Sequence, residues 1–193
     1  MEFSSRQKQI IDASIELIAR QGIQELTIRN LSEMVGISEP AIYRHFASKN
    51  EILLALLGYF GEQSEKAFKE IAGTGISALD KLRAVFDHHF RYFAQKPSFS
   101  AVLFSEEIFR NDSGLSSKMF RIMQGAGDHM LSFVREGQMS GQVRKDVPTG
   151  QLSLILLGAL RLLVTKWRFS GFSFDLVEEG EKLWEALLGL LRA

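Results

Sequence analysis

The spacing of apolar residues constrains the fold of this 193-residue chain more than any other feature. Apolar side chains recur at intervals of three and four, which is the helical period, and no strand-like alternation of useful length occurs. Only three prolines interrupt the pattern. The pattern predicts an all-α chain of about nine helices, at residues 5–21, 28–35, from 39, 48–71, 77–95, about three turns ending at 110, 115–139, 149–169 and 174–191.

Residues 26–49 carry the most specific local pattern. Thr27 and Ser38 are good N-caps for two short helices, and Gly36 between them tolerates the positive φ of a tight turn. Leu31, Val35, Ile37 and Ile42 are spaced to pack this pair against the first helix. The pattern predicts a helix-turn-helix whose second helix enters the major groove of double-stranded DNA.

Charge does not by itself point to a nucleic acid. The chain holds 23 basic and 23 acidic residues, so its formal net charge is zero. Residues 1–50 are balanced as well, and DNA attraction must therefore come from the placement of charges.

The segment also resembles the TetR family of regulators over about residues 5–60. The resemblance rests on Thr27, on Leu31 with the Val35–Ser38 turn, on the run from Ala41 to Phe46, and on Lys49. It implies phosphate contacts by Thr27, Tyr43, His45 and Lys49, whereas Phe46 is expected in the core. The full set of expected DNA-binding residues is Thr27, Arg29, Ser38, Glu39, Pro40, Ala41, Tyr43, Arg44, His45 and Lys49.

Arg29, Glu39, Ala41 and Arg44 face the groove in this interpretation. An arginine can bind guanine through two hydrogen bonds. Glu39 has two interpretations. It can accept a hydrogen bond from cytosine, or it can simply stabilise the start of its helix, which we favour.

The resemblance further implies a division into a DNA-binding domain at 1–48 and a ligand-binding and dimerisation domain at 49–193. The function expected is a dimeric repressor that a small, largely apolar ligand releases from a pseudo-palindromic operator. The alternative is a DNA-bound interaction protein whose larger domain binds another protein.

Nine aromatic residues lie between Phe86 and Phe133, and three of them, Phe86, Phe90 and Phe93, share one face of a helix. Ordinary core packing accounts for most of them. The functional interpretation is an apolar cavity for a small ligand, with the polar side chains of His89 and Arg161 at its wall. The candidate ligand-binding residues are Phe86, His89, Phe90, Phe93, Phe104, Met123 and Arg161.

The last two helices predict a dimer. Leu152–Val164 is apolar almost all the way round, and the final helix carries two apolar stripes, one of which needs a partner chain to cover it. The expected interface residues are Leu156, Leu160, Leu163, Trp167, Val177, Trp184, Leu188 and Leu191. Arg161 would need a carboxylate there, from Glu178, Glu181 or Glu185.

The sequence gives little support to an enzyme, a metal site or a membrane protein. Ser140 stands one place off the nucleophile-elbow spacing, and the adjacent His88 and His89 point to different helix faces, so we expect no enzyme, metal or cofactor. The longest apolar run has 13 residues and contains Arg161, too short to span a membrane. The polar N-terminus is not a secretory signal, so a cytoplasmic protein is expected.

Overall fold

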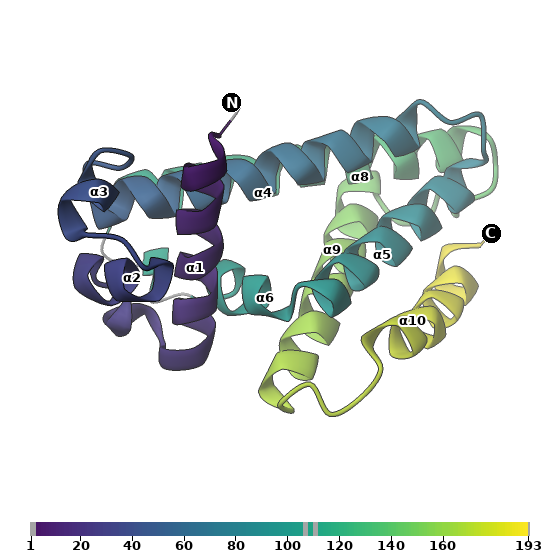
Figure 1. Ribbon diagram of the computed structural model, residues 1–193. Coiled ribbons are helices and arrows are strands. Elements are labelled where there is room, and N and C mark those ends of the chain that lie inside the picture. Colours follow the sequence, from purple (N-terminus) through teal and green to yellow (C-terminus); the bar gives the residue numbers. More distant parts are fainter. Residues whose placement is uncertain (1–2, 106–107, 110–111, 193) are drawn as a thin grey trace. The chain divides into compact units, whose positions relative to one another are not determined.

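The computed structural model describes residues 3–105, 108–109 and 112–192, and within these ranges it contains helices and no strands (Figure 1). The all-α prediction is confirmed. No helix in these ranges is long and apolar enough to cross a membrane. The helices are α1 (Ser5–Gln21), η1 (Ile23–Glu25), α2 (Ile28–Val35), α3 (Glu39–Tyr43), α4 (Lys49–Ala72), α5 (Ala78–Gln95), α6 (Pro97–Leu103), α8 (Ser113–Met139), α9 (Thr149–Phe169) and α10 (Leu176–Leu191).

Short acidic side chains set two helix starts differently from the sequence prediction. The Asp112 carboxylate accepts a hydrogen bond from the Leu115 backbone N–H at 2.8 Å, so α8 begins at Ser113 rather than at Leu115. Asp175 caps α10 by accepting from the N–H groups of Val177 and Glu178, so α10 begins at Leu176 rather than at residue 174. A carboxylate at this position satisfies free backbone donors and suits the helix dipole.

The region before α8 departs further from prediction. Helix α6 ends at Leu103, whereas the sequence predicted a helix as far as residue 110. Residues 108 and 109 are helical, whereas residues 106–107 and 110–111 lie outside the described ranges, so the prediction for those four residues is not tested.

The chain forms two compact units. The first comprises residues 1–61 and 98–121, and the second comprises residues 62–97 and 122–193. Helices α4 and α8 each begin in the first unit and end in the second. In the first unit, Phe99 of α6 lies 6.4 Å in ring-centroid distance from both Tyr59 and Phe60 of α4, so α6 belongs to the same body as the N-terminal helices.

Helix α5 is the centre of the second unit, and α9 and α10 pack against it (Figure 1). Phe86 of α5 meets Trp184 of α10 at 5.4 Å between ring centroids. Gly180 of α10 lies directly on the ring of Phe90, so close that a Cβ at this position would overlap the ring. Lys81 is buried at the end of the same core and donates to both carboxylate oxygens of Glu136, at 2.8 and 2.9 Å.

The faces of α9 and α10 are oriented differently from the dimer prediction. Most of the expected interface residues are core residues of the protomer itself, namely Leu156, Leu160, Trp167, Trp184 and Leu191, while Leu163, Val177 and Leu188 are half-buried. The exposed apolar strip of α9 instead holds Leu154, Ile155 and Leu162. Because α9 is apolar on nearly every side, its sequence could not distinguish the face that meets α5 from the face that meets solvent.

The contact between Gly180 and Phe90 predicts a clear stability difference. Replacing Gly180 with Ala should lower the free energy of unfolding by about 1–3 kcal/mol, because the added methyl must displace a packed ring. The matched control is Gly125→Ala in α8, where no atom lies within 4 Å of the added Cβ. There the better helix propensity of alanine should raise stability by up to about 1 kcal/mol. Urea unfolding at one protein concentration measures both, and equal effects of the two variants would contradict this packing.

Candidate nucleic-acid interface

Helices α2 and α3 form a helix-turn-helix closed by Gly36. This glycine has φ +73°, in the left-handed region, and the N–H groups of both Gly36 and Ile37 donate to the Ser32 carbonyl at 3.0 Å. Thr27 caps α2 by accepting from the Asn30 N–H at 3.1 Å, as the sequence predicted. The turn is therefore built by local hydrogen bonds and a residue that tolerates positive φ.

Buried side chains hold α3 in place. Leu31 and Ile42 are fully buried, and Phe46, which follows α3, is 3% exposed. The Gln7 amide of α1 donates to the His45 carbonyl at 3.5 Å, a long hydrogen bond across the sequence that no local pattern indicates. One face of the short α3 is thus fixed against the core, which leaves its other face to solvent.

The ten residues expected to bind DNA all lie at the surface of the first unit. Seven are exposed and three, Ala41, His45 and Lys49, are half-buried. Tyr43 is 52% exposed only three residues from buried Phe46. The two aromatic residues of this run therefore have different roles: Phe46 packs the core, and the Tyr43 ring is presented outward.

The charged groups of this surface differ in their availability. Arg29 pairs with Glu33 one turn along α2 at 3.1 Å, and both side chains are largely exposed. Such a surface pair contributes only about 0.2–1 kcal/mol and can exchange for another partner. Within the described ranges Arg44 and Lys49 form no ion pair, and the Ser38 hydroxyl makes no capping hydrogen bond. These groups are open to an incoming anion.

The start of α4 places Lys49 beside this surface. Ser48 accepts from the Glu51 N–H at 3.2 Å, and the Glu51 carboxylate accepts from the backbone N–H of Ala47. In an ordinary capping box the return contact ends on the N-cap residue itself, here Ser48, so this contact is displaced by one residue. The exchange still defines the first turn of α4, in which Lys49 is the first residue.

The candidate ligand-binding residues differ in their exposure. Phe86, Phe90 and Phe93 are buried, Phe104 is half-buried, Met123 is 50% exposed and Arg161 is exposed. Met123 and Arg161 are therefore accessible to solvent. A cavity that the structure does contain in the second unit is lined by none of the seven.

His89 is the polar residue of this group nearest the core. Burial, together with the neighbouring His88, lowers the pKa of His89 to about 4, so the ring is neutral at pH 7. Its Nδ1 lies 3.1 Å from the Val85 carbonyl, which can only accept, and therefore Nδ1 carries the hydrogen. A neutral imidazole here is compatible with an apolar neighbourhood that includes the rings of Phe68 and Phe93.

Comparison with known proteins covers nearly the whole chain. Residues 10–56 match the model for bacterial regulatory proteins of the tetR family, and residues 56–189 match the model for the C-terminal region of YsiA-like proteins. The fatty acid metabolism regulator protein of Bacillus subtilis (strain 168) is 27% identical over 184 residues, covering 93% of this chain and 92% of that protein.

Two further similarities bear on function. The crystal structure of a transcriptional regulator FadR from Bacillus subtilis in complex with stearoyl-CoA matches with a TM-score of 0.82 at 25% identity, covering 94% of this chain and 97% of that one. The nucleoid occlusion factor SlmA of Photobacterium profundum is 21% identical over 185 residues, covering 95% of this chain and 94% of that protein.

Proposed function

The chain belongs to the TetR family of bacterial regulatory proteins, and we propose that it represses transcription as a homodimer that a small, largely apolar ligand releases from DNA. Residues 1–48 read the operator, and residues 49–193 carry the dimer interface and the ligand site. The protein acts in the cytoplasm and is not an enzyme. The observation that carries the proposal is α3, held by buried Ile42 and Phe46 while Tyr43 and Arg44 face outward.

Phosphate contacts set the position of the protein on DNA. The hydroxyl groups of Thr27 and Tyr43, the imidazole of His45 and the ammonium of Lys49 can each donate to a phosphate oxygen. The hydroxyl of Thr27 accepts a hydrogen bond from the backbone, which leaves its own hydrogen to donate. These contacts carry no sequence information, so base recognition needs other side chains.

Arg44 and Arg29 are the proposed base-reading residues. Arg44 is exposed at the end of α3 and can bind guanine directly. Arg29 reaches a base only by leaving Glu33, a weak surface pair that DNA can replace. Glu39 is the first residue of α3, where its carboxylate stabilises the helix.

The exposed strip of α9 is the proposed centre of the dimer. Leu154 and Leu162 are 70% and 68% exposed, Ile155 lies between them, and Gly158 in the same strip has no atom within 4 Å of a built Cβ. Two copies of α9 could therefore cross closely at Gly158. The exposed Leu190 of α10 would add a further apolar contact between the two protomers. A two-fold dimer would present two copies of α3 to half-sites about 34–36 Å apart.

The proposed ligand is a long-chain acyl thioester, the class that the Bacillus subtilis regulator binds. An acyl chain would enter the aromatic core around α5 by displacing contacts such as that between the Phe86 and Phe90 rings. It would release DNA only through a difference in its affinity for the two states of the protein. Helix α4 is the proposed link, since it begins in the first unit and ends in the second.

A protein partner is the second candidate for the larger domain. Similarity to a nucleoid occlusion factor favours it, as does the burial of Phe86, Phe90 and Phe93 of α5 in the core of the second unit. Both candidates use the same helix-turn-helix, so only the response to a ligand separates them.

Variants of the phosphate-contacting side chains test DNA binding. Tyr43→Phe removes one hydroxyl and should weaken binding to all sequences by about tenfold. Lys49→Gln should weaken binding by a similar factor and should lower the slope of the logarithm of the binding constant against the logarithm of salt concentration by about one. Fluorescence anisotropy across a salt series measures both. The matched control is Arg192→Gln, an exposed cation beyond α10, which removes the same charge and should leave the slope unchanged.

Removal of the apolar strip tests the dimer. Leu162→Glu places a charge at the centre of the strip without touching the core, and it should convert the dimer to a folded monomer in light scattering. Ile76→Glu is the control, because Ile76 is also exposed and apolar but stands outside α9 and α10. A dimer that persists in Leu162→Glu, or a wild-type chain that is monomeric at micromolar concentration, would refute this interface.

Addition of stearoyl-CoA to the protein–DNA complex separates the two candidate functions. The repressor proposal predicts release of the DNA at micromolar concentrations of the thioester, and no release by free CoA, which lacks the apolar chain. DNA binding that is indifferent to both compounds favours the protein-partner function instead.

A further inference from the structure

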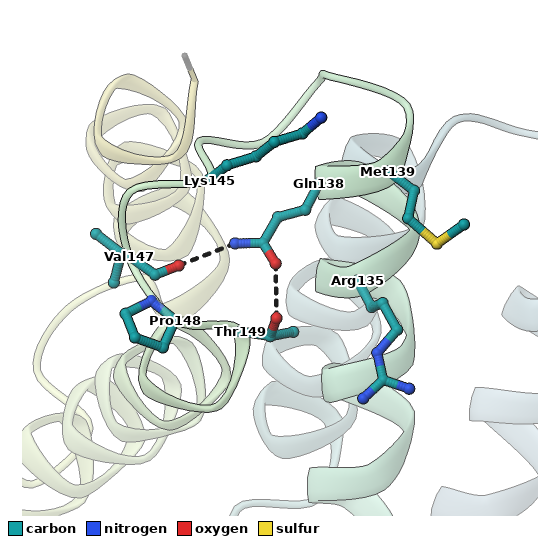
Figure 2. A pocket seen from close by; sticks show the side chains of 7 residues that line it. All are labelled: Arg135, Gln138, Met139, Lys145, Val147, Pro148 and Thr149. Carbon is teal, nitrogen blue, oxygen red and sulfur yellow. Dashed lines mark hydrogen bonds between the residues drawn. The ribbon is translucent and has the colours of Figure 1, made fainter.

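A surface cavity of about 300 Å³ lies where the end of α8 meets the loop before α9 (Figure 2). Its volume is at the lower end of the range of small-molecule sites, about 300–1,000 Å³. Arg135, Gln138 and Met139 come from α8, and residues 145 and 147–149 come from the loop and the start of α9. Neither the DNA-binding surface nor the proposed ligand core includes these residues.

The wall of the cavity is held in place by Gln138. Its amide nitrogen donates to the carbonyl oxygens of Arg144 and Val147, both at 2.9 Å, and its amide oxygen accepts from the Thr149 hydroxyl at 2.6 Å. Figure 2 shows the contacts to Val147 and Thr149. The backbone N–H of Arg144 also donates to the Leu191 carbonyl at 2.8 Å, which ties the loop to α10. The loop is therefore positioned before any ligand arrives, which lowers the entropic cost of binding.

The charge around the cavity is positive. Arg135 and Lys145 are exposed, and neither forms an ion pair within the part of the chain that the structure describes. The neighbouring carboxylates are already engaged: Asp146 pairs with Arg144, and Glu136 with Lys81. Two uncompensated cations thus remain in a chain whose formal net charge is zero.

The two cations lie on opposite sides of Gln138 (Figure 2). A compact anion can approach one of them, whereas an elongated molecule with an anionic group near each end can engage both. Met139, Val147 and Pro148 add apolar surface to the lining of the cavity. We propose that this cavity binds an elongated small molecule with two phosphate groups.

Two sources supply that chemistry. One is a free bisphosphorylated metabolite, and the other is the nucleotide part of coenzyme A, which carries a diphosphate and a separate ribose phosphate. The inference stands without the proposed function, since binding to the cavity is measured in the absence of DNA and of any acyl chain.

Calorimetric titration of the full chain tests the proposal with three probes: fructose 1,6-bisphosphate, free CoA and inorganic phosphate. At least one of the two larger probes should bind saturably, and inorganic phosphate should bind about tenfold more weakly or not at all. Arg135→Gln and Lys145→Gln should each weaken binding of the larger probe by about tenfold, as expected for loss of one charge-assisted contact. Arg91→Gln is the control, because it removes an exposed cation of α5 outside the cavity.

Each outcome bears on the proposal. Charge-dependent binding of the bisphosphate assigns the cavity to a metabolite, and charge-dependent binding of free CoA assigns it to the coenzyme. The proposal is overturned if neither larger probe binds at millimolar concentration, if inorganic phosphate binds as tightly, or if Arg91→Gln weakens binding as much as the cavity variants do. Circular dichroism of each variant confirms that the fold is intact.

Discussion

The burial of Ile42 and Phe46 is the constraint on which the proposed DNA-binding surface depends. Helix α3 has only five residues, and a helix that short has little stability of its own. Its position comes from side chains that are 0% and 3% exposed, together with the Gly36 turn and the hydrogen bond from Gln7. Because these contacts use one face of α3, the side chains of Tyr43 and Arg44 remain available to bind DNA.

A second constraint governs the larger unit. Gly180 allows α10 to lie directly on the Phe90 ring, and this contact brings Trp184 against Phe86. The α5 aromatics are therefore a packed core in this structure. The proposed acyl chain would have to separate side chains that now contact one another, such as Phe86 and Phe90, and that cost would enter any ligand response. The same packing turns Leu154, Ile155 and Leu162 of α9 outward.

Local signals in the sequence were sufficient for much of the fold. The Thr27 cap, the Gly36 turn and the apolar period of α1 and α4 depend on neighbouring residues, so they could be predicted without tertiary information. The exposure of Tyr43 beside buried Phe46 also followed from the expected motif. By contrast, Ser173 and Asp175 are both plausible caps for α10, and only the structure shows that the Asp175 carboxylate makes the bonds.

Long-range packing could not be predicted in this way. Five of the residues expected at a dimer interface are buried in the protomer. The sequence of a helix that is apolar on nearly every side, such as α9, does not show which face meets the core and which meets a partner. Met123 looked like a cavity residue by composition but is half exposed. The cavity at Arg135 and Lys145 had no recognisable motif, since its residues come together only through the bonds of Gln138 with residues 144, 147 and 149.

Selection of bound sequences from random DNA by the full chain shows whether α3 reads bases at all. Base reading by α3 predicts enrichment of a pseudo-palindrome with half-sites about one helical turn or somewhat further apart, and relaxed preference at particular positions with Arg44→Gln. Recovery of unenriched sequences, or of a motif that Arg44→Gln leaves unchanged, would contradict it.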